Sequence, residues 1–179
     1  MRYCVFCGSN RGTSPIHAET VAELARCLAG SGIGIVYGGG NVGLMGVLAD
    51  AALAEGGEVI GVIPRMLVVR EIAHQSLSEL RIVGSMHERK ALMADLSDGF
   101  IAAPGGYGTL DEFCEILTWT QLGLQQKPVG ILNVDGYFDH LLALFDHAVA
   151  ERFVKPIHRD MIVTDDTPAS LIARMRVPG

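Results

Sequence analysis

The feature that most constrains the fold of this chain is the regular alternation of short apolar segments with helix-forming segments. The segments that predict strands cover residues 2–7, 33–37, 58–63, 99–103 and 128–132, with shorter ones near 80–83 and 161–163. The segments that predict helices cover residues 15–30, 43–55, 85–96, 110–122, 137–152 and 168–176. Strands that alternate with helices build βαβ units and a mostly parallel sheet, and continuous apolar strands indicate burial on both faces. We therefore expect an α/β fold, a single doubly wound, Rossmann-like domain over residues 1–179 with helices flanking the sheet.

Charge and hydropathy narrow the range of partners. The formal net charge is −6, which is the wrong sign for a nucleic-acid surface. No apolar run reaches the roughly 18 residues of a membrane span, and the N-terminal segment lacks the pattern of a signal peptide. We therefore expect neither nucleic acid nor a membrane as a partner, whereas small anionic ligands held by backbone amides remain compatible with an acidic chain.

The cysteine pattern bears on the compartment. Cys4 and Cys7 form a CxxC sequence, but both fall in the first predicted strand, where a separation of three places them on opposite faces. A redox CxxC belongs at a helix N-terminus, where the helix dipole lowers the thiol pKa. These residues are therefore predicted to be buried free thiols, which favours a cytoplasmic protein.

The carboxyl ends of the predicted strands are rich in glycine and small polar residues. In doubly wound folds the ligand binds at these ends. They carry Gly8-Ser9-Asn10, Gly38-Gly39-Gly40-Asn41, Pro64-Arg65 and Pro104 to Thr109. Because glycine lets backbone N–H groups approach a ligand closely, this edge, with Ser9 among its polar groups, is predicted to meet a phosphate.

The segment Gly38 to Gly43 matches the pattern GxGxxG between a strand and a helix. A dinucleotide site also needs an acid about 20 residues further on, at the end of the next strand. That strand ends in Pro64-Arg65, so a mononucleotide or sugar phosphate is favoured over NAD, and no cofactor is expected. A contact from Gly39 to the ligand and a tight turn that only packs helix on strand are equally good interpretations.

The segment Pro104 to Glu112 (PGGYGTLDE) is more specific, since it places a glycine turn before a helix N-terminus that suits a phosphate. Thr109 would cap the helix or bond a phosphate oxygen. The alternative is that Thr109 and Glu112 form only a capping box. Glu112 and Glu115 share a helix face; a functional role is favoured for Glu112, and the two interpretations are even for Glu115.

The segment Ser85 to Lys90 (SMHERK) lies at another helix start. Arg89 and Lys90 oppose the helix dipole there, which indicates an anionic ligand or a partnering acid. The alternative is a pair of solvated surface cations. No second histidine follows His87 at helical spacing, so no metal site is expected.

Residues 84–115 resemble the paired signature of the Lonely Guy (LOG) family of cytokinin-nucleotide phosphoribohydrolases, in the segments 86–90 (MHERK) and 104–112. Flanking matches extend the resemblance to residues 1 to about 165: Gly8-Ser9, 37–40, 43–46, 70–72, 127–130 and 133–137. Relatives were long labelled lysine decarboxylases. A pyridoxal enzyme needs a Schiff-base lysine, and none of Lys90, Lys127 and Lys155 lies in a recognisable context for one.

The resemblance implies hydrolysis of the N-glycosidic bond of an (N6-prenyl)adenosine 5′-monophosphate to free base and ribose 5-phosphate. It assigns catalysis to Arg89 and Glu112. It assigns substrate binding to Glu71, Met86, Lys90, Gly105, Gly106, Tyr107, Gly108, Thr109, Leu110 and Asp111. It also implies a homodimer or a hexamer, with helices near 85–97 and 108–124 at the interface. The alternatives are a general purine or pyrimidine nucleoside-monophosphate nucleosidase acting on AMP, and a non-catalytic carrier related to molybdenum-cofactor carriers.

Overall fold

The computed structural model describes residues 1–68 and 72–176. Over these ranges one parallel sheet holds seven strands: β1 (Arg2–Phe6), β2 (Gly34–Tyr37), β3 (Val59–Pro64), β4 (Glu79–Val83), β5 (Gly99–Ala102), β6 (Val129–Leu132) and β7 (Ile162–Asp165). Their order is β4-β3-β2-β1-β5-β6-β7, so the chain builds outward from β1 in one direction and then, from β5, in the other. The predicted doubly wound parallel sheet is confirmed.

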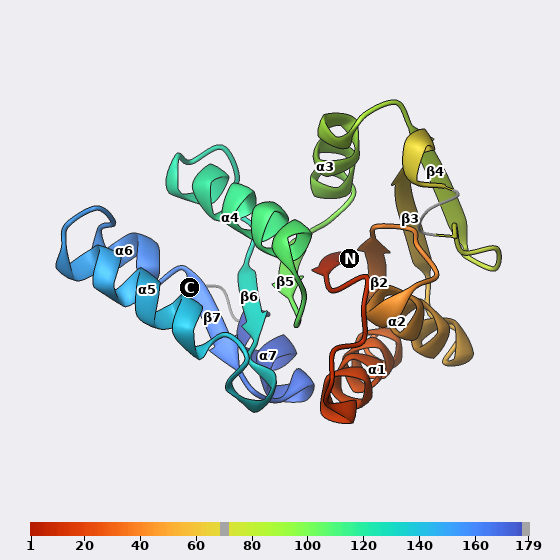
Figure 1. The fold of residues 1–179 in the computed structure, drawn as a ribbon, viewed down its shortest axis with the longest axis horizontal. Coiled ribbons are helices and arrows are strands. Elements are labelled where there is room, and N and C mark those ends of the chain that lie inside the picture. The colour runs from red at the N-terminus through yellow and green to blue at the C-terminus, as the bar shows by residue number, and fades with distance from the viewer. Residues whose placement is uncertain (69–71, 177–179) are drawn as a thin grey trace.

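Helices cover both faces of this sheet (Figure 1). On one face lie α1 (Pro15–Gly30), α2 (Gly43–Ala54) and α7 (Pro168–Met175). On the other lie α3 (Met86–Asp95), α4 (Tyr107–Gln121) and α5 (Asp139–Ala150). Three short elements were not predicted: α6 (Pro156–Arg159) and the 3₁₀ turns η1 (Arg65–Leu67) and η2 (Val134–Gly136). No helix within the described ranges is both long and apolar enough to cross a bilayer.

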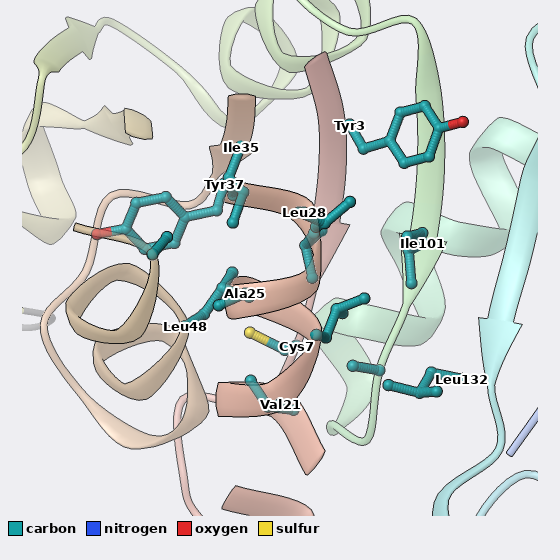
Figure 2. Close-up of a cluster of buried hydrophobic side chains, with 14 of the residues drawn as sticks. Tyr3, Cys7, Val21, Ala25, Leu28, Ile35, Tyr37, Leu48, Ile101 and Leu132 are labelled. Carbon is teal, nitrogen blue, oxygen red and sulfur yellow. The ribbon is translucent and has the colours of Figure 1, made fainter. Parts of the chain in front are cut away.

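Two hydrophobic cores result, one on each face of the sheet. The first core lies against α1, α2 and α7, and Figure 2 shows Cys7, Leu28 and Ile101 within it. The second core lies against α3, α4 and α5 and includes Cys4 and Phe113. Because successive strand residues point to opposite faces, Cys4 and Cys7 belong to different cores. The prediction of two buried free thiols on opposite faces is confirmed.

Candidate active site

The candidate site lies where the strand order reverses, between the carboxyl ends of β1 and β5. Ala103 N–H donates to Phe6 O at 2.9 Å, and Gly8 N–H donates to Pro104 O at 3.0 Å, so the two chain segments leave the sheet side by side. Two adjoining cavities open here, and both are lined by Gly8, Ser9 and Gly106. Such a reversal is where doubly wound folds bind their ligands.

The small cavity has a volume of about 170 Å³. It is lined by Cys7, Gly8, Ser9, Met45, Met86, Arg89, Gly106, Tyr107, Gly108, Thr109, Asp111 and Glu112. The large cavity has a volume of about 400 Å³. It is lined by Gly8, Ser9, Asn10, Arg11, Gly12, Thr13, His17, Leu44, Pro104, Gly105, Gly106 and Tyr137. The predicted catalytic pair, Arg89 and Glu112, is therefore brought together in the small cavity.

Helix α4 begins at Tyr107, three residues before the predicted start at residue 110. Gly106 is its N-cap and makes no side-chain capping bond, and Leu110 N–H donates to Gly106 O at 3.1 Å. Thr109 is therefore the third residue of the helix, so the predictions that it caps α4 or forms a capping box with Glu112 are wrong. The N-cap, Gly106, has no side chain that could cap the first-turn N–H groups of α4, and the residues of this turn line the small cavity.

Thr109 instead supports the glycine loop from inside the helix. It is buried, and a Cβ built on Gly105 would overlap its hydroxyl and lie 2.9 Å from Gly8 N. Only glycine fits at position 105 without displacing these neighbours. The close packing holds the end of β5 against the first turn of α4 and against the end of β1.

A variant of the capping box occurs at the start of α3, in which the carboxylate bonds the N–H group of the residue before the N-cap, Ser85. Ser85 Oγ accepts a hydrogen bond from Glu88 N–H at 3.1 Å, and Glu88 Oε2 accepts one from Gly84 N–H at 2.7 Å. The pattern Ser-x-x-Glu was present in the sequence as a signal for it. This cap fixes the first turn of α3, which carries Arg89.

Arg89 spans the ends of two strands and is only 6% exposed. Its Nε–H donates to Val62 O of β3 at 3.1 Å, and Nη2–H donates to Gly38 O, just beyond β2, at 2.9 Å. A Cβ on Gly38 would overlap Nη2 and would displace the guanidinium from this position. The interpretation of Arg89 as a solvated surface cation is wrong, because its guanidinium is anchored in the sheet and forms part of the cavity wall.

Lys90 does not line the small cavity and forms an ion-paired cluster between α3 and α4. Its Nζ lies 3.2 Å from Asp111 Oδ2 and 3.1 Å from Glu115 Oε2. Partial burial disfavours its charge, but the hydrogen bonds to Glu115 and Asp111 outweigh burial and raise the pKa of Lys90. The sequence predicted either an anionic ligand or a partnering acid for a cation at this position. For Lys90 the structure shows partnering acids, Asp111 and Glu115.

The charges of Glu112 and Arg89 both reach the thiol of Cys4 beneath the cavity. Burial raises the pKa of Cys4 well above its usual value, the carboxylate of Glu112 raises it further, and a hydrogen bond with Ser97 and the charge of Arg89 oppose this. Burial and then Glu112 also raise the pKa of Cys7, which lines the small cavity. Both groups stay protonated thiols at neutral pH, so neither supplies a thiolate nucleophile.

The remaining predicted residues are distributed around the two cavities. Gly39 lines neither of them; it has a φ of +75°, and a Cβ added there would lie 3.2 Å from Ile63 Cβ and 3.3 Å from Leu80 Cδ1. Leu110 packs against the second core, and Glu115 is engaged with Lys90. Glu71 lies outside the described residues.

Sequence reasoning missed several residues that line the cavities, among them Met45, Arg11, His17 and Tyr137. Tyr137 follows the carboxyl end of β6, a strand end that the sequence analysis did not treat as part of the site. The rule that ligands meet the carboxyl ends of parallel strands was a sufficient signal for it. Arg11 and His17 had no such signal, since they lie in and just after a long loop from β1 to α1.

Comparisons with known proteins agree on the family and the fold. A family model described as "Possible lysine decarboxylase" matches residues 45–175. A rice (Oryza sativa subsp. japonica) relative named "Probable cytokinin riboside 5′-monophosphate phosphoribohydrolase LOGL1" is 52% identical over 97% of this chain and 78% of its own. The Arabidopsis thaliana relative "Cytokinin riboside 5′-monophosphate phosphoribohydrolase LOG3" is 47% identical over 97% of this chain and 81% of its own.

Among solved structures, the molybdenum cofactor binding protein from Rippkaea orientalis superposes with a TM-score of 0.74 at 23% identity, over 98% of this chain and 94% of that chain. At this identity the likeness shows a shared fold alone.

The lysines do not fit the decarboxylase description. Lys90 is ion-paired between two helices, Lys127 Nζ donates to Ala94 O at 2.8 Å, and Lys155 is exposed before α6. None of them faces the small or the large cavity, where a Schiff base to a pyridoxal group would have to form. With relatives about half identical over nearly its whole length, this chain belongs to the LOG family, whose curated members are named cytokinin riboside 5′-monophosphate phosphoribohydrolases.

Proposed function

We propose that this protein hydrolyses the N-glycosidic bond of a purine nucleoside 5′-monophosphate, with N6-prenylated AMP as the preferred substrate and AMP as a poorer one. The products are the free base and ribose 5-phosphate. One observation carries the proposal: a carboxylate, Glu112, and an anchored cation, Arg89, line the same cavity beside the first turn of α4. The names of the relatives supply the substrate class.

The glycine loop and the start of α4 suit the 5′-phosphate. Gly106, Tyr107, Gly108 and Thr109 all line the small cavity, and the N-cap of this turn is a glycine, which makes no side-chain capping bond. Backbone amides at a helix start, together with the positive end of the helix dipole, favour an anion, even in a protein of negative net charge. A phosphate held there places the ribose next to Glu112, one turn further along the helix.

In the proposed reaction the bond from C1′ to N9 breaks with oxocarbenium character, and its electron pair leaves with the base. Glu112 stabilises the positive charge on the sugar and orients a water molecule, whose oxygen bonds to C1′. Glu112 accepts a proton of this water and gives it up to the departing base, which becomes protonated at nitrogen. The carboxylate is then returned to its starting state.

Arg89 contributes a stationary positive charge rather than a proton, because a guanidinium keeps its proton at any working pH. Two of its N–H groups are bonded to Val62 O and Gly38 O, so its position does not depend on the substrate. This charge balances the carboxylate of Glu112 and the incoming phosphate. An anchored charge of this kind needs no reorganisation when the transition state forms.

Residues around the small cavity are consistent with binding of a prenylated base and with contact to a second subunit. Met45 and Met86 line it, and Met86 is partly exposed and Tyr107 is 94% exposed. Methionine side chains adapt to irregular apolar groups such as a prenyl chain. We propose that a second copy of this chain covers α3 and α4 in a homodimer, and that the protein acts in the cytoplasm.

The proposal is tested by measuring base release from AMP and from prenyl-AMP. For Glu112→Gln we expect kcat to fall by about 10²-fold or more, because general acid–base catalysis contributes about 10²–10⁴-fold. The KM for AMP should change little, because this substitution removes a group that acts in the transition state. Glu79→Gln, an equivalent change in an ion pair with Arg81 on β4, is the matched control and should keep the wild-type rate.

Wild-type rates in Glu112→Gln would contradict the proposed mechanism. Tight nucleotide binding by the wild-type protein with no release of base from a panel of nucleoside monophosphates would contradict hydrolysis itself, and would indicate a carrier.

A further inference from the structure

Tyr137 joins the turn after β6 to the glycine loop after β5. Its Oη–H donates a hydrogen bond to Gly105 O at 2.5 Å. The two residues are 32 positions apart in the chain and meet because β5 and β6 are neighbours in the sheet. Gly105 and Tyr137 both line the large cavity, and Tyr137 does not line the small one.

The ring of Tyr137 is held in place by its surroundings. It packs edge-on against His17 of α1, with ring centroids 5.6 Å apart, and against Phe138 at 4.9 Å. Asn133 Oδ1 accepts a hydrogen bond from Phe138 N–H at 2.7 Å, which closes the turn that carries the tyrosine. The hydroxyl therefore meets Gly105 from a fixed direction.

The direction of Gly105 O determines the direction of the next amide. The described residues contain no cis peptide bond, and in a trans peptide the C=O and N–H groups point in opposite directions. Gly105 O points to Tyr137 on the side of the large cavity, so Gly106 N–H points to the opposite side. Gly106 lines both cavities, whereas Arg89 and Glu112 line only the small one, which neither Gly105 nor Tyr137 lines.

This peptide needs an external restraint because both of its residues are glycines. Glycine populates a wide range of φ and ψ angles, so the plane between Gly105 and Gly106 can rotate at low cost. Such a rotation would replace an N–H donor by a carbonyl oxygen, which repels a phosphate. The hydrogen bond from Tyr137 opposes that rotation.

We infer that Tyr137 is a positioning residue of the phosphate site, whose hydroxyl orients the Gly105–Gly106 peptide so that Gly106 N–H is presented to the 5′-phosphate. The inference rests on the proposed function, in that it takes a phosphate as the anion at this loop. Tyr137 acts through Gly106 and touches neither the sugar nor the base.

The test is the substitution Tyr137→Phe, which keeps the ring against His17 and Phe138 and removes only the hydroxyl. We expect the KM for AMP and the Kd for ribose 5-phosphate to rise by about tenfold, the equivalent of about one hydrogen bond. The kcat should stay within about threefold of wild type, and the Kd for adenosine, which lacks the phosphate, should be unchanged. Tyr3→Phe removes a hydroxyl at the opposite end of β1 and is the matched control, with no expected change.

An unchanged Kd for ribose 5-phosphate in Tyr137→Phe would overturn the inference, and so would an equal loss of affinity for adenosine, which would indicate general damage to the site. A second measurement uses the wild-type protein alone. The amide resonance of Gly106 should shift strongly when inorganic phosphate is added, and its absence from the set of shifted resonances would also overturn the inference.

These readouts separate the inference from the proposed function. Ribose 5-phosphate and inorganic phosphate bind without any turnover, so their titrations test Tyr137 even if no base is released from any nucleotide. Failure of base release alone would contradict only the hydrolysis. A wild-type protein that binds neither ribose 5-phosphate nor inorganic phosphate at millimolar concentration would overturn the role of Tyr137.

Discussion

Arg89 contributes to the stability of the fold as well as to the charge of the site. Its guanidinium donates to the carbonyl oxygens of Val62 and Gly38, which lie at the ends of neighbouring strands, and it is only 6% exposed. Without the guanidinium, both carbonyl oxygens would lose a charged donor. The side chain therefore holds the edge of the sheet together as well as forming the wall of the cavity.

We predict that Arg89→Met lowers the free energy of unfolding by about 2–4 kcal/mol, since it removes two hydrogen bonds from a charged group to buried backbone carbonyls. Urea denaturation measures this change, and base release from AMP should fall as well. Arg81→Met is the control, because Arg81 is half exposed in an ion pair with Glu79 and should change stability by no more than about 0.5 kcal/mol. Equal stabilities of Arg89→Met and wild type would show that the two carbonyl contacts carry no net energy.

The start of α4 shows that two capping signals in the sequence can disagree about where a helix begins. The pattern Thr-x-x-Glu at Thr109 and Glu112 suggested a capping box, yet α4 begins at Tyr107 with Gly106 as its N-cap. Gly105 and Gly106 let the chain enter the helix earlier than a threonine cap would. The working cap belongs to Ser85 at the start of α3.

We predict that Ser85→Ala lowers the free energy of unfolding by about 1 kcal/mol, because it removes the side-chain acceptor for Glu88 N–H. Ser14 is the N-cap of α1 by position but makes no side-chain capping bond, so Ser14→Ala is the control and should have a smaller effect. Chemical denaturation of the two variants in parallel gives the comparison. A loss for Ser14→Ala as large as that for Ser85→Ala would mean that the cap geometry is not what stabilises α3.

At the scale of the whole molecule, the two cores share one sheet and should unfold together. Strand β1, for example, supplies Val5 to the first core and Phe6 to the second, and both residues are buried. Trp119, the only tryptophan, lies on α4 and packs against the second core. Its fluorescence therefore reports on one face of the sheet.

We predict that Leu28→Ala, a cavity-forming change in the first core, lowers the free energy of unfolding by about 2–5 kcal/mol. The transition followed by Trp119 fluorescence should shift as far as the one followed by far-UV circular dichroism, because coincident transitions mark two-state unfolding. Leu144→Ala on α5, where the side chain is 59% exposed, is the control and should shift neither. A fluorescence transition that stays in place would mean that the two faces unfold separately.

The sequence alone was sufficient for the order and type of the main elements and for the motifs at the site. Strand and helix patterns depend on neighbours within a few residues, so they predicted β1 to β7 closely, and the glycine-rich strand ends located the site. The short elements α6, η1 and η2 were not predicted, because three or four residues are too few to show a periodic hydrophobic pattern. The start of α4 was predicted incorrectly, and the contacts of Arg89 with Val62 O and Gly38 O were not predicted, for a different reason.

Contacts between distant parts of the chain decided the rest. Arg89 meets Gly38 across 51 residues and Val62 across 27, and Tyr137 meets Gly105 across 32. Lys90 finds Asp111 and Glu115 only because α3 and α4 lie side by side on one face of the sheet. Local sequence patterns do not indicate which strands become neighbours in the sheet. The sequence by itself determined which residues could serve the site, and the strand order of the folded sheet determined which of them meet.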